Sequence, residues 1–310
     1  MRRVPTIQDY ERALGHPLRQ VGGSRPSGRG VSPDLPLVSV VTIVRNGRDL
    51  LPGTVRSVLA QTYPNIEYVV VDGGSTDGTV DVLRRFDDRI DRWISEPDRG
   101  TSDAANKAIS LARGRYIALF NCGDWFDPGF IDTAVACLGR SGADYAFGDL
   151  RTYRNETLVQ VVKGDPNAMA PPAPDTARFA VPALVTRTSP TMVMKRACFE
   201  RVGLFDLSYK VRNDFDWILR LHLSGGRGVY DSRLIGHFRL GGVSDIGSDF
   251  AHIFENLRIL RRHGLLTSAT AAPYLYRLIR YSTGHVAGRL LPDALRRTIK
   301  RAARLVFRWS

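Results

Sequence analysis

Cysteine is scarce in this sequence, and long hydrophobic runs are absent. Only Cys122, Cys137 and Cys198 occur among the 310 residues, and none belongs to a Cys-x-x-Cys pair. This spacing argues against a disulfide framework or a zinc site and favours reduced thiols, so we expect a cytoplasmic protein. No apolar run approaches the ~20 residues that a membrane-spanning helix needs, and no apolar signal follows Met1. We therefore expect neither a membrane span nor export.

Negative charge is sparse at the two ends of the chain. The formal net charge is +13. Residues 1–35 contain six arginines and three acids, and residues 277–310 contain nine basic residues and only Asp293, so the basic character belongs to the ends. Glycine, serine and arginine dominate residues 22–30. That composition predicts a flexible basic arm over residues 1–35, with one short helix near Gln8–Leu14.

From residue 37 the chain alternates between short apolar runs and helical patterns. The runs predict buried strands at Val38–Val44, Ile66–Val71, Arg92–Ser95 and Tyr116–Leu119. Helical spacing of apolar residues follows the first strand over 49–61, and two further helices are expected to end near Arg85 and to span 101–113. This alternation predicts an α/β fold: a Rossmann-like, mainly parallel sheet flanked by helices.

The pattern loosens after Asp124. We predict helices at 130–138, 214–223 and 253–262, and strands at 143–148 and 191–194. Residues 164–182 contain five prolines and predict a long irregular loop, which in a compact domain is often a lid or a binding segment.

Carboxylates occupy positions where a ligand site is expected. Asp72 and Asp124 follow buried strands, and Asp214 precedes a helix. Gly123 permits a sharp turn just before Asp124. In open α/β sheets ligands bind beyond the carboxyl ends of the strands. Carboxylates gathered at such an edge normally hold a cation, and hard divalent ions commonly bridge a carboxylate to phosphates. An alternative stays open, because turns and helix N-caps also favour Asp for local reasons.

Eight stretches carry a resemblance to a known family. They are Val38–Asn46, Ser57–Glu67, Val71–Thr79, Ile94–Gly100, Asp103–Ala108, Asn121–Asp124, Gly203–Asp206 and Asn213–Trp217. In this order, over roughly residues 37–245, they resemble the family 2 inverting glycosyltransferases of the GT-A fold, especially the colanic-acid-type subgroup. The resemblance implies a glycosyltransferase domain over residues 36–245. The arm (1–35) and a basic helical extension (246–310) lie outside it.

The resemblance also implies roles for individual residues. The donor-binding positions that match the family are Thr42, Val44, Asn46, Asp72, Asp98, Asp103, Asn106, Lys107 and Asn121. Asp124 matches the metal ligand at the end of the Asp-x-Asp motif, and Asp214 matches the catalytic base. His237 is a further candidate for the metal or the diphosphate, although a lone histidine beside a strand is more often structural.

The chain departs from the family pattern at two places. The usual Asp-Ser-Asp-Asp is Asn121-Cys122-Gly123-Asp124, so the metal is expected to bind more weakly, and the Glu before the base is Asn213. Because the first departure resembles the Asn-x-Gly-Asp form of the colanic-acid-type subgroup, we still expect an active enzyme.

The function implied by the resemblance is transfer of a sugar from a nucleotide-diphosphate donor to a hydroxyl of a glycan or lipid-linked acceptor. A divalent cation, Mg²⁺ or Mn²⁺, would assist an inverting single displacement. Two alternatives stay open. A nucleotidyltransferase would need a Gly-rich basic phosphate loop near the first strand, and none is present. A non-catalytic scaffold on the same fold would hydrolyse no nucleotide sugar.

The carboxyl-terminal basic segment suggests a membrane partner. Leu295, Ile299, Ala302, Val306 and Trp309 share one face of a helical pattern whose other face is rich in Arg and Lys. This pattern is typical of a helix at an anionic membrane interface, here the inner face of the plasma membrane. Packing of the same helix on the catalytic domain is the alternative. No nucleic-acid recognition motif is present, so nucleic acid is not expected as a partner.

Overall fold

The structure is a computed structural model of the chain. It describes residues 4–13, 19–25, 34–164, 191–241, 249–267, 270, 271 and 274. The predicted loop at 164–182 lies almost entirely outside the described residues, as does the basic segment 277–310. None of the helices in the described part of the chain has the length and apolarity that crossing a membrane requires.

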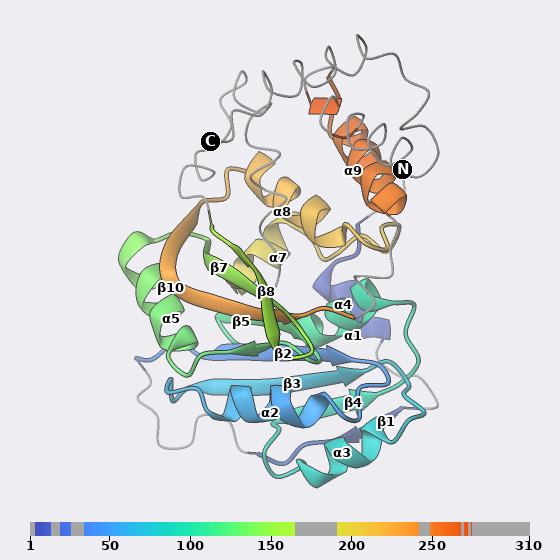
Figure 1. The fold of residues 1–310 in the computed structure, drawn as a ribbon, viewed down its shortest axis with the longest axis vertical. Coiled ribbons are helices and arrows are strands. Elements are labelled where there is room, and N and C mark those ends of the chain that lie inside the picture. Colours follow the sequence, from blue (N-terminus) through green and yellow to red (C-terminus); the bar gives the residue numbers. More distant parts are fainter. Residues whose placement is uncertain are drawn as a thin grey trace.

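One mixed sheet forms the centre of the molecule (Figure 1). Its strands are β1 (Gln20–Gly22), β2 (Val38–Val44), β3 (Ile66–Asp72), β4 (Arg92–Ser95), β5 (Tyr116–Asn121), β6 (Trp125–Phe126), β7 (Tyr145–Arg154), β8 (Thr157–Val162), β9 (Met192–Lys195) and β10 (Gly228–Arg239). The order is β1-β4-β3-β2-β5-β9-β7-β10-β6, and β8 pairs with β7. Strands β4, β3, β2 and β5 are parallel neighbours, which confirms the predicted parallel centre.

Helices cover both faces of the sheet (Figure 1). Their bounds are α1 (Ile7–Ala13), α2 (Leu51–Leu59), α3 (Thr79–Arg85), α4 (Thr101–Leu111), α5 (Phe130–Ser141), α7 (Arg196–Val202), α8 (Asn213–Leu223) and α9 (Asp249–Arg262). One apolar cluster joins the sheet to α2, α3 and α5. The other joins the opposite face to α1, α4, α7, α8 and α9. Strands β2 and β3 are buried at every residue because helices cover both of their faces.

The amino-terminal segment is not a uniformly mobile arm. Helix α1 buries Ile7 and Tyr10 against the cluster around α4, and Tyr10 donates a hydrogen bond to Asp103. Strand β1 pairs antiparallel with β4, with Gln20 opposite Ser95. The short helix predicted near Gln8–Leu14 is present as α1. The prediction of a flexible arm does not extend to α1 and β1, because their apolar side chains and backbone groups have partners on the domain.

Helix α9 belongs to the packed unit. Ile253, Ile259 and Leu260 are buried in the same cluster as α8. The domain boundary that we predicted at residue 245 therefore falls before a helix that is part of the core.

Candidate active site at the carboxyl edge of the parallel strands

The turns after β2, β3, β4 and β5 share one edge of the sheet, because these four strands run parallel. The first two turns are tied together through Asn46. Its backbone N–H donates to Ser75 Oγ at 2.7 Å, and its side-chain Oδ1 accepts from Thr76 N at 3.0 Å. Asn46 has φ 51°, a left-handed conformation that asparagine tolerates better than most residues. The structure therefore gives Asn46 a loop-positioning role at the edge.

Asp72 ends β3 with a fully buried carboxylate. Its Oδ2 accepts from Ser75 N at 3.0 Å and from Ser95 Oγ at 2.6 Å, and its Oδ1 accepts from the Ser75 hydroxyl. These contacts match the alternative interpretation of Asp72 as a turn residue, because neighbouring donors already satisfy both carboxylate oxygens.

Asp98 is packed against the turn after β3. A Cβ on Gly73 would lie 2.0 Å from Asp98 Oδ2, so the close approach requires glycine. Asp98 Oδ1 accepts from Gly100 N at 2.8 Å. Burial raises the pKa of Asp98, while that hydrogen bond and the charges of Lys107 and Arg45 oppose the rise. Among the predicted donor-binding acids Asp98 has the fewest protein partners in the described chain, so it is well placed to contact a ligand.

Three predicted donor-binding residues on α4 have structural partners instead. Asp103 accepts from Tyr10 and, at 2.7 Å, from Arg99 Nη2. Burial alone would raise the pKa of Asp103, but the hydrogen bonds from Arg99 and Tyr10 outweigh it and hold the pKa below its usual value.

The other two, Asn106 and Lys107, also bind protein atoms. The Asn106 side chain hydrogen-bonds both backbone groups of Phe205. Its Nδ2 donates to the carbonyl and its Oδ1 accepts from the N–H, each at 2.9 Å. Lys107 Nζ lies 2.8 Å from Glu96 Oε1 and 2.9 Å from Pro97 O. These contacts fix α4 against its neighbours, and donor binding by the three side chains stays a prediction without support from their geometry.

Two predicted positions on β2 lie inside the sheet. Thr42 is fully buried, and its hydroxyl accepts a hydrogen bond from Tyr68 Oη at 3.2 Å. The Val44 side chain belongs to the apolar cluster under α2, and its carbonyl accepts from Gly73 N at 2.9 Å. Both side chains belong to the core. The resemblance to the family at Thr42 and Val44 therefore identifies strand β2 rather than atoms that contact a ligand.

Asp124 stands out among the acids of the edge. Only 2% of the residue is exposed, its Oδ1 accepts from Arg239 N at 3.2 Å, and its Oδ2 is buried without a hydrogen-bond partner. Burial raises the pKa of Asp124 to about 8, against the lowering effect of hydrogen bonds from Arg239 and Asn121. The carboxyl group therefore favours its neutral form unless a positive charge arrives.

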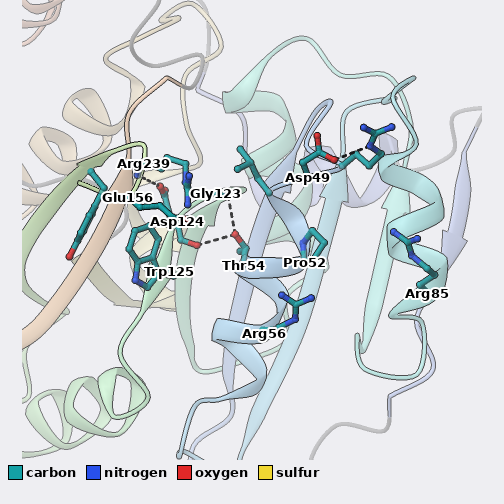
Figure 2. A pocket seen from close by; sticks show the side chains of 14 residues that line it. Asp49, Pro52, Thr54, Arg56, Arg85, Gly123, Asp124, Trp125, Glu156 and Arg239 are labelled. Carbon is teal, nitrogen blue, oxygen red and sulfur yellow. Dashed lines mark hydrogen bonds and ion pairs between the residues drawn. The ribbon is translucent and has the colours of Figure 1, made fainter. Parts of the chain in front are cut away.

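The turn that carries Asp124 is fastened to the start of α2. Thr54 Oγ1 donates to the Asp124 carbonyl at 3.0 Å and accepts from Gly123 N at 2.9 Å (Figure 2). Gly123 has φ 101°, a conformation that side chains other than glycine rarely adopt. Asn121 begins the turn, and its carbonyl accepts from Asp124 N at 3.1 Å. The sharp turn predicted at Gly123 is thus present and is held on both sides.

Asp124 suits one ligand of a divalent cation. An orphaned, buried carboxylate oxygen is the kind of atom that a hard cation satisfies. Among the described residues, however, no group of three or more His, Cys, Asp or Glu side chains is arranged to hold a metal ion. Further ligands would have to be substrate oxygens or water, as is common for Mg²⁺.

His237 has both ring nitrogens occupied by protein. Its Nδ1 lies 3.0 Å from Tyr153 Oη and its Nε2 lies 3.2 Å from Asp127 Oδ1. The ring stacks on Trp125 at a centroid distance of 5.1 Å and an interplanar angle of 11°. Burial lowers the pKa of His237, although Asp127 opposes the shift. This geometry matches the structural alternative, a support for Trp125, and gives no free nitrogen for a metal.

A cavity of about 820 Å³ opens in front of Asp124 (Figure 2). Gly123, Asp124, Trp125 and the start of α2 form one part of its wall, and Tyr153, Glu156 and Arg239 form another. Arg48, Arg56 and Arg85 also line it. Asp72, Asp98 and Asp214 are not among the lining residues, so the structure does not bring all predicted site residues into one cavity.

Asp214 lies in the first turn of α8, which begins one residue before the predicted start, and its Oδ1 accepts from Phe215 N at 2.7 Å. The neighbouring Asn213 Nδ2 donates to Ser102 Oγ at 2.7 Å, so the first turns of α8 and α4 are in contact. Since α4 follows the carboxyl end of β4, this contact places Asp214 toward the same sheet edge as Asp98. Burial raises the pKa of Asp214, and the charge of Arg212 opposes the shift.

Arg239 is one of the cavity residues that the sequence interpretation missed. It ends β10, two residues after His237, and its backbone contacts a carboxylate 115 residues earlier in the chain. Its only signal in the sequence is its place in the stretch after His237, because the strand pairing that brings it to Asp124 cannot be deduced from local pattern.

Comparisons with known proteins agree with this fold. The family model described as Glycosyl transferase family 2 matches residues 39–203, more than half of the chain. A Bacillus subtilis glycosyltransferase named for teichuronic acid biosynthesis, TuaG, is 45% identical over 92 residues, which are 29% of this chain and 36% of that protein. The chain thus spans about a third of the length of this relative.

A second relative is matched over most of its length. The UDP-Glc:alpha-D-GlcNAc-diphosphoundecaprenol beta-1,3-glucosyltransferase WfaP of Escherichia coli is 24% identical over 236 residues, which are 74% of this chain and 87% of that protein.

Solved structures show the same fold. S. aureus TarS residues 1–349, in complex with UDP-GlcNAc, superposes with a TM-score of 0.60 at 17% identity and covers 82% of this chain and 74% of that one. The mannosyltransferase PcManGT of Pyrobaculum calidifontis, in complex with GDP-Man and Mn²⁺, gives 0.58 at 17% identity, over 97% of this chain and 87% of that one. The narrower resemblance to the colanic-acid-type subgroup stays a prediction. By the family model that it matches, by its named relatives and by its GT-A architecture, the chain belongs to glycosyl transferase family 2.

Proposed function

We propose that this protein transfers a sugar from a nucleoside-diphosphate donor to a hydroxyl of a glycan or lipid-linked acceptor, with inversion at the anomeric carbon. The observation that carries the proposal is the buried, unpartnered Oδ2 of Asp124, a residue that lines a cavity at the carboxyl edge of the parallel strands. Family membership and the nucleotide sugars named for TarS and PcManGT support the donor class.

A divalent cation is part of the proposal. Asp124 is the described residue that would hold Mg²⁺ or Mn²⁺, and His237 is not, since Tyr153 and Asp127 occupy its nitrogens. When bound, the cation supplies positive charge that stabilises the departing diphosphate. The Mn²⁺ in the PcManGT complex supports this assignment.

Asp214 is the proposed general base. It takes the proton of the acceptor hydroxyl while that oxygen bonds to the anomeric carbon and the bond from this carbon to the phosphoryl oxygen breaks. One displacement from the opposite side inverts the configuration. An ordinary aspartate, with a pKa near ~4, is a weak base at neutral pH. Burial raises the pKa of Asp214 and so strengthens it as a base.

On the donor side, we propose that Asp98 contacts the nucleoside, whereas Asp72 and Asn46 shape the turns that receive it. Asp98 has a single backbone donor in the described chain, while the Asp72 carboxylate and the Asn46 amide oxygen are already bonded to the protein. Asp98→Asn should therefore weaken binding of the nucleoside diphosphate, and Asp72→Asn should chiefly lower stability.

The test of the function is a thermal-shift screen of the full chain against UDP-, GDP-, TDP- and CDP-sugars, each with and without Mn²⁺. A bound donor raises the melting temperature by mass action, and we expect one nucleotide class to do so in a Mn²⁺-dependent way. Slow Mn²⁺-dependent hydrolysis of the same donor should follow, with release of the nucleoside diphosphate. A chain that binds and hydrolyses no nucleotide sugar would instead support the scaffold alternative.

The acceptor and the membrane contact are also proposals. The name of WfaP includes a diphosphoundecaprenol acceptor, which supports a lipid-linked acceptor here. We further propose that the basic residues of 277–310, which lie outside the described residues, bind an anionic membrane surface. Flotation with vesicles of anionic and of neutral lipids tests this proposal. Selective binding to the anionic vesicles is expected, and equal recovery with both kinds would contradict it.

A further inference from the structure

Arg239 lies beside Asp124, and its side chain has no hydrogen-bond or ion-pair partner among the described residues. Its Nε is buried and has no hydrogen-bond partner, and none of the ion pairs among the described residues includes its guanidinium group. The guanidinium carbon lies 5.9 Å from the centroid of the Trp125 ring. Its backbone N–H nevertheless binds Asp124 Oδ1, so the two residues are immediate neighbours.

The missing ion pair is informative. A guanidinium stays charged, and leaving a buried donor such as its Nε unsatisfied is unfavourable. The natural partner would be the Asp124 carboxylate, yet Asp124 Oδ2 is also buried and unpartnered. The two side chains thus line the same cavity without a hydrogen bond between the guanidinium and the carboxyl group.

A cation together with a phosphoryl group satisfies both side chains at once. Asp124 would hold the cation, the guanidinium would donate to phosphoryl oxygens, and the two parts of the ligand would neutralise each other. Guanidinium groups match phosphate oxygens through their planar fork of donors. Three further arginines, Arg48, Arg56 and Arg85, line the same cavity and favour an anionic ligand.

The side chain of Arg239 is held in place. Its Cδ would lie 3.9 Å from a Cβ on Gly123, so it packs over the bare backbone of the turn. Trp125 lies beside the guanidinium and stacks in turn on His237, which Tyr153 and Asp127 fix. This packing limits the loss of side-chain entropy when a ligand binds.

We propose that Arg239 binds a phosphoryl oxygen of the donor diphosphate in this cavity, beside a cation on Asp124. The proposal rests on the proposed function and adds a residue to it. In this proposal Arg239, at the end of β10, is the residue that contacts the ligand. His237 on the same strand only supports Trp125.

The experiment is isothermal titration of the full chain with UDP, GDP, TDP and CDP, each in the presence of Mn²⁺. The tightest of the four is then titrated into Arg239→Ala, Arg239→Lys and a control, Arg233→Ala. Arg233 is an exposed arginine on the same strand, where it pairs with Asp231. Melting followed by circular dichroism establishes that each variant is folded.

We expect Arg239→Ala to weaken nucleoside diphosphate binding by about tenfold to a hundredfold, the usual effect of losing a hydrogen bond to a charged group. Arg239→Lys keeps the charge but not the fork and should recover only part of the loss. Arg233→Ala should bind within about twofold of wild type.

Binding by folded Arg239→Ala within about twofold of wild type would overturn the proposal while leaving the proposed function intact. A wild-type chain that binds none of the four nucleotides would instead contradict the proposed function itself. If Arg239→Ala is unfolded, Arg239→Lys decides: wild-type affinity in that variant excludes a role for the forked donor geometry.

Discussion

At the scale of single residues, the supply of hydrogen-bond donors separates the acids proposed to act from the acids that support the fold. Asp72 and Asp103 are buried, but neighbouring donors satisfy their carboxylates. These two side chains therefore stabilise the local structure. Asp124 is buried and Asp214 is half-buried, both with fewer donors, and loss of contact with water raises the pKa of each. A carboxylate that the protein leaves short of donors is available to a cation or to a proton.

Replacing the proposed base tests its role. Asp214→Asn should lower the transfer rate about a hundredfold or more, because the acceptor hydroxyl loses its proton acceptor. Donor binding should stay within about threefold of wild type, since the amide keeps the shape of the carboxyl. Steady-state rates and titration with the donor nucleotide measure the two effects. The control is Glu200→Gln, an exposed acid on α7. Near-normal turnover in Asp214→Asn would remove Asp214 from the mechanism.

The pH dependence of the reaction follows from the same residue. The base must be ionised, so kcat/KM should fall as the pH drops through the pKa of Asp214 in the free enzyme. Because burial raises that pKa, the acid limb should lie above the value of ~4 expected for an ordinary aspartate. A profile of kcat/KM between pH 4 and pH 9 measures it. An acid limb at or below pH 4 would show that this carboxyl is not the titrating base.

At the scale of elements, local pattern predicted the parallel strands well. Strand β2 spans the predicted residues, and β3 extends the prediction by one residue, because runs of β-branched residues buried on both faces have few other solutions. Strand β10 was missed. Its burial is irregular, and its pairing with β7 shifts between Tyr230 and Ile235, so neither alternation nor a continuous apolar run marks it.

The candidate site likewise contains residues that local sequence pattern predicts and residues that it does not. The sequence predicted Asp124 and the turn at Gly123, since both lie at the end of a strand that local pattern identifies. It could not predict that β10 would bring Arg239 to Asp124. Nor could it predict that Tyr153 and Asp127 would bind the ring nitrogens of His237 while Trp125 stacks on its ring. Those contacts depend on strand pairing between segments far apart in the chain.

Helix α1 gives a test at this scale. Tyr10→Phe removes the donor to the buried Asp103 and should destabilise the protein by about 1–2 kcal/mol, because a buried carboxylate loses a hydrogen bond. Urea unfolding followed by circular dichroism measures the change. Gln8→Ala, at an exposed position of the same helix, should change stability by less than about 0.5 kcal/mol. Equal stability of Tyr10→Phe and wild type would mean that α1 does not pack on α4 in solution.

At the scale of the whole molecule, the parallel strands supply the edge and the remaining strands complete the cavity. Strand β5 ends at the turn that carries Asp124, and β10 crosses to pair with both β7 and β6, the two-residue strand after that turn. The cavity therefore exists only where two distant parts of the chain meet, which is a common place for ligand sites.

Asp124→Asn tests the proposed cation site, and we expect the variant to keep the wild-type fold. Burial favours the neutral form of Asp124 at neutral pH, so a neutral amide of the same shape should be tolerated in the absence of metal. A matched control is Asp49→Asn, because Asp49 lines the same cavity but is exposed and paired with Arg48. Both variants should melt close to wild type in EDTA.

The decisive measurement is the Mn²⁺ dependence of nucleoside diphosphate binding in these variants. Wild type and Asp49→Asn should bind the nucleotide at least about tenfold more tightly with Mn²⁺ than with EDTA, since a cation on Asp124 neutralises the diphosphate. Asp124→Asn should keep the weak binding seen in EDTA and lose the gain from Mn²⁺. If Asp124→Asn gains as much from Mn²⁺ as wild type does, the cation lies elsewhere and the account of this site is wrong.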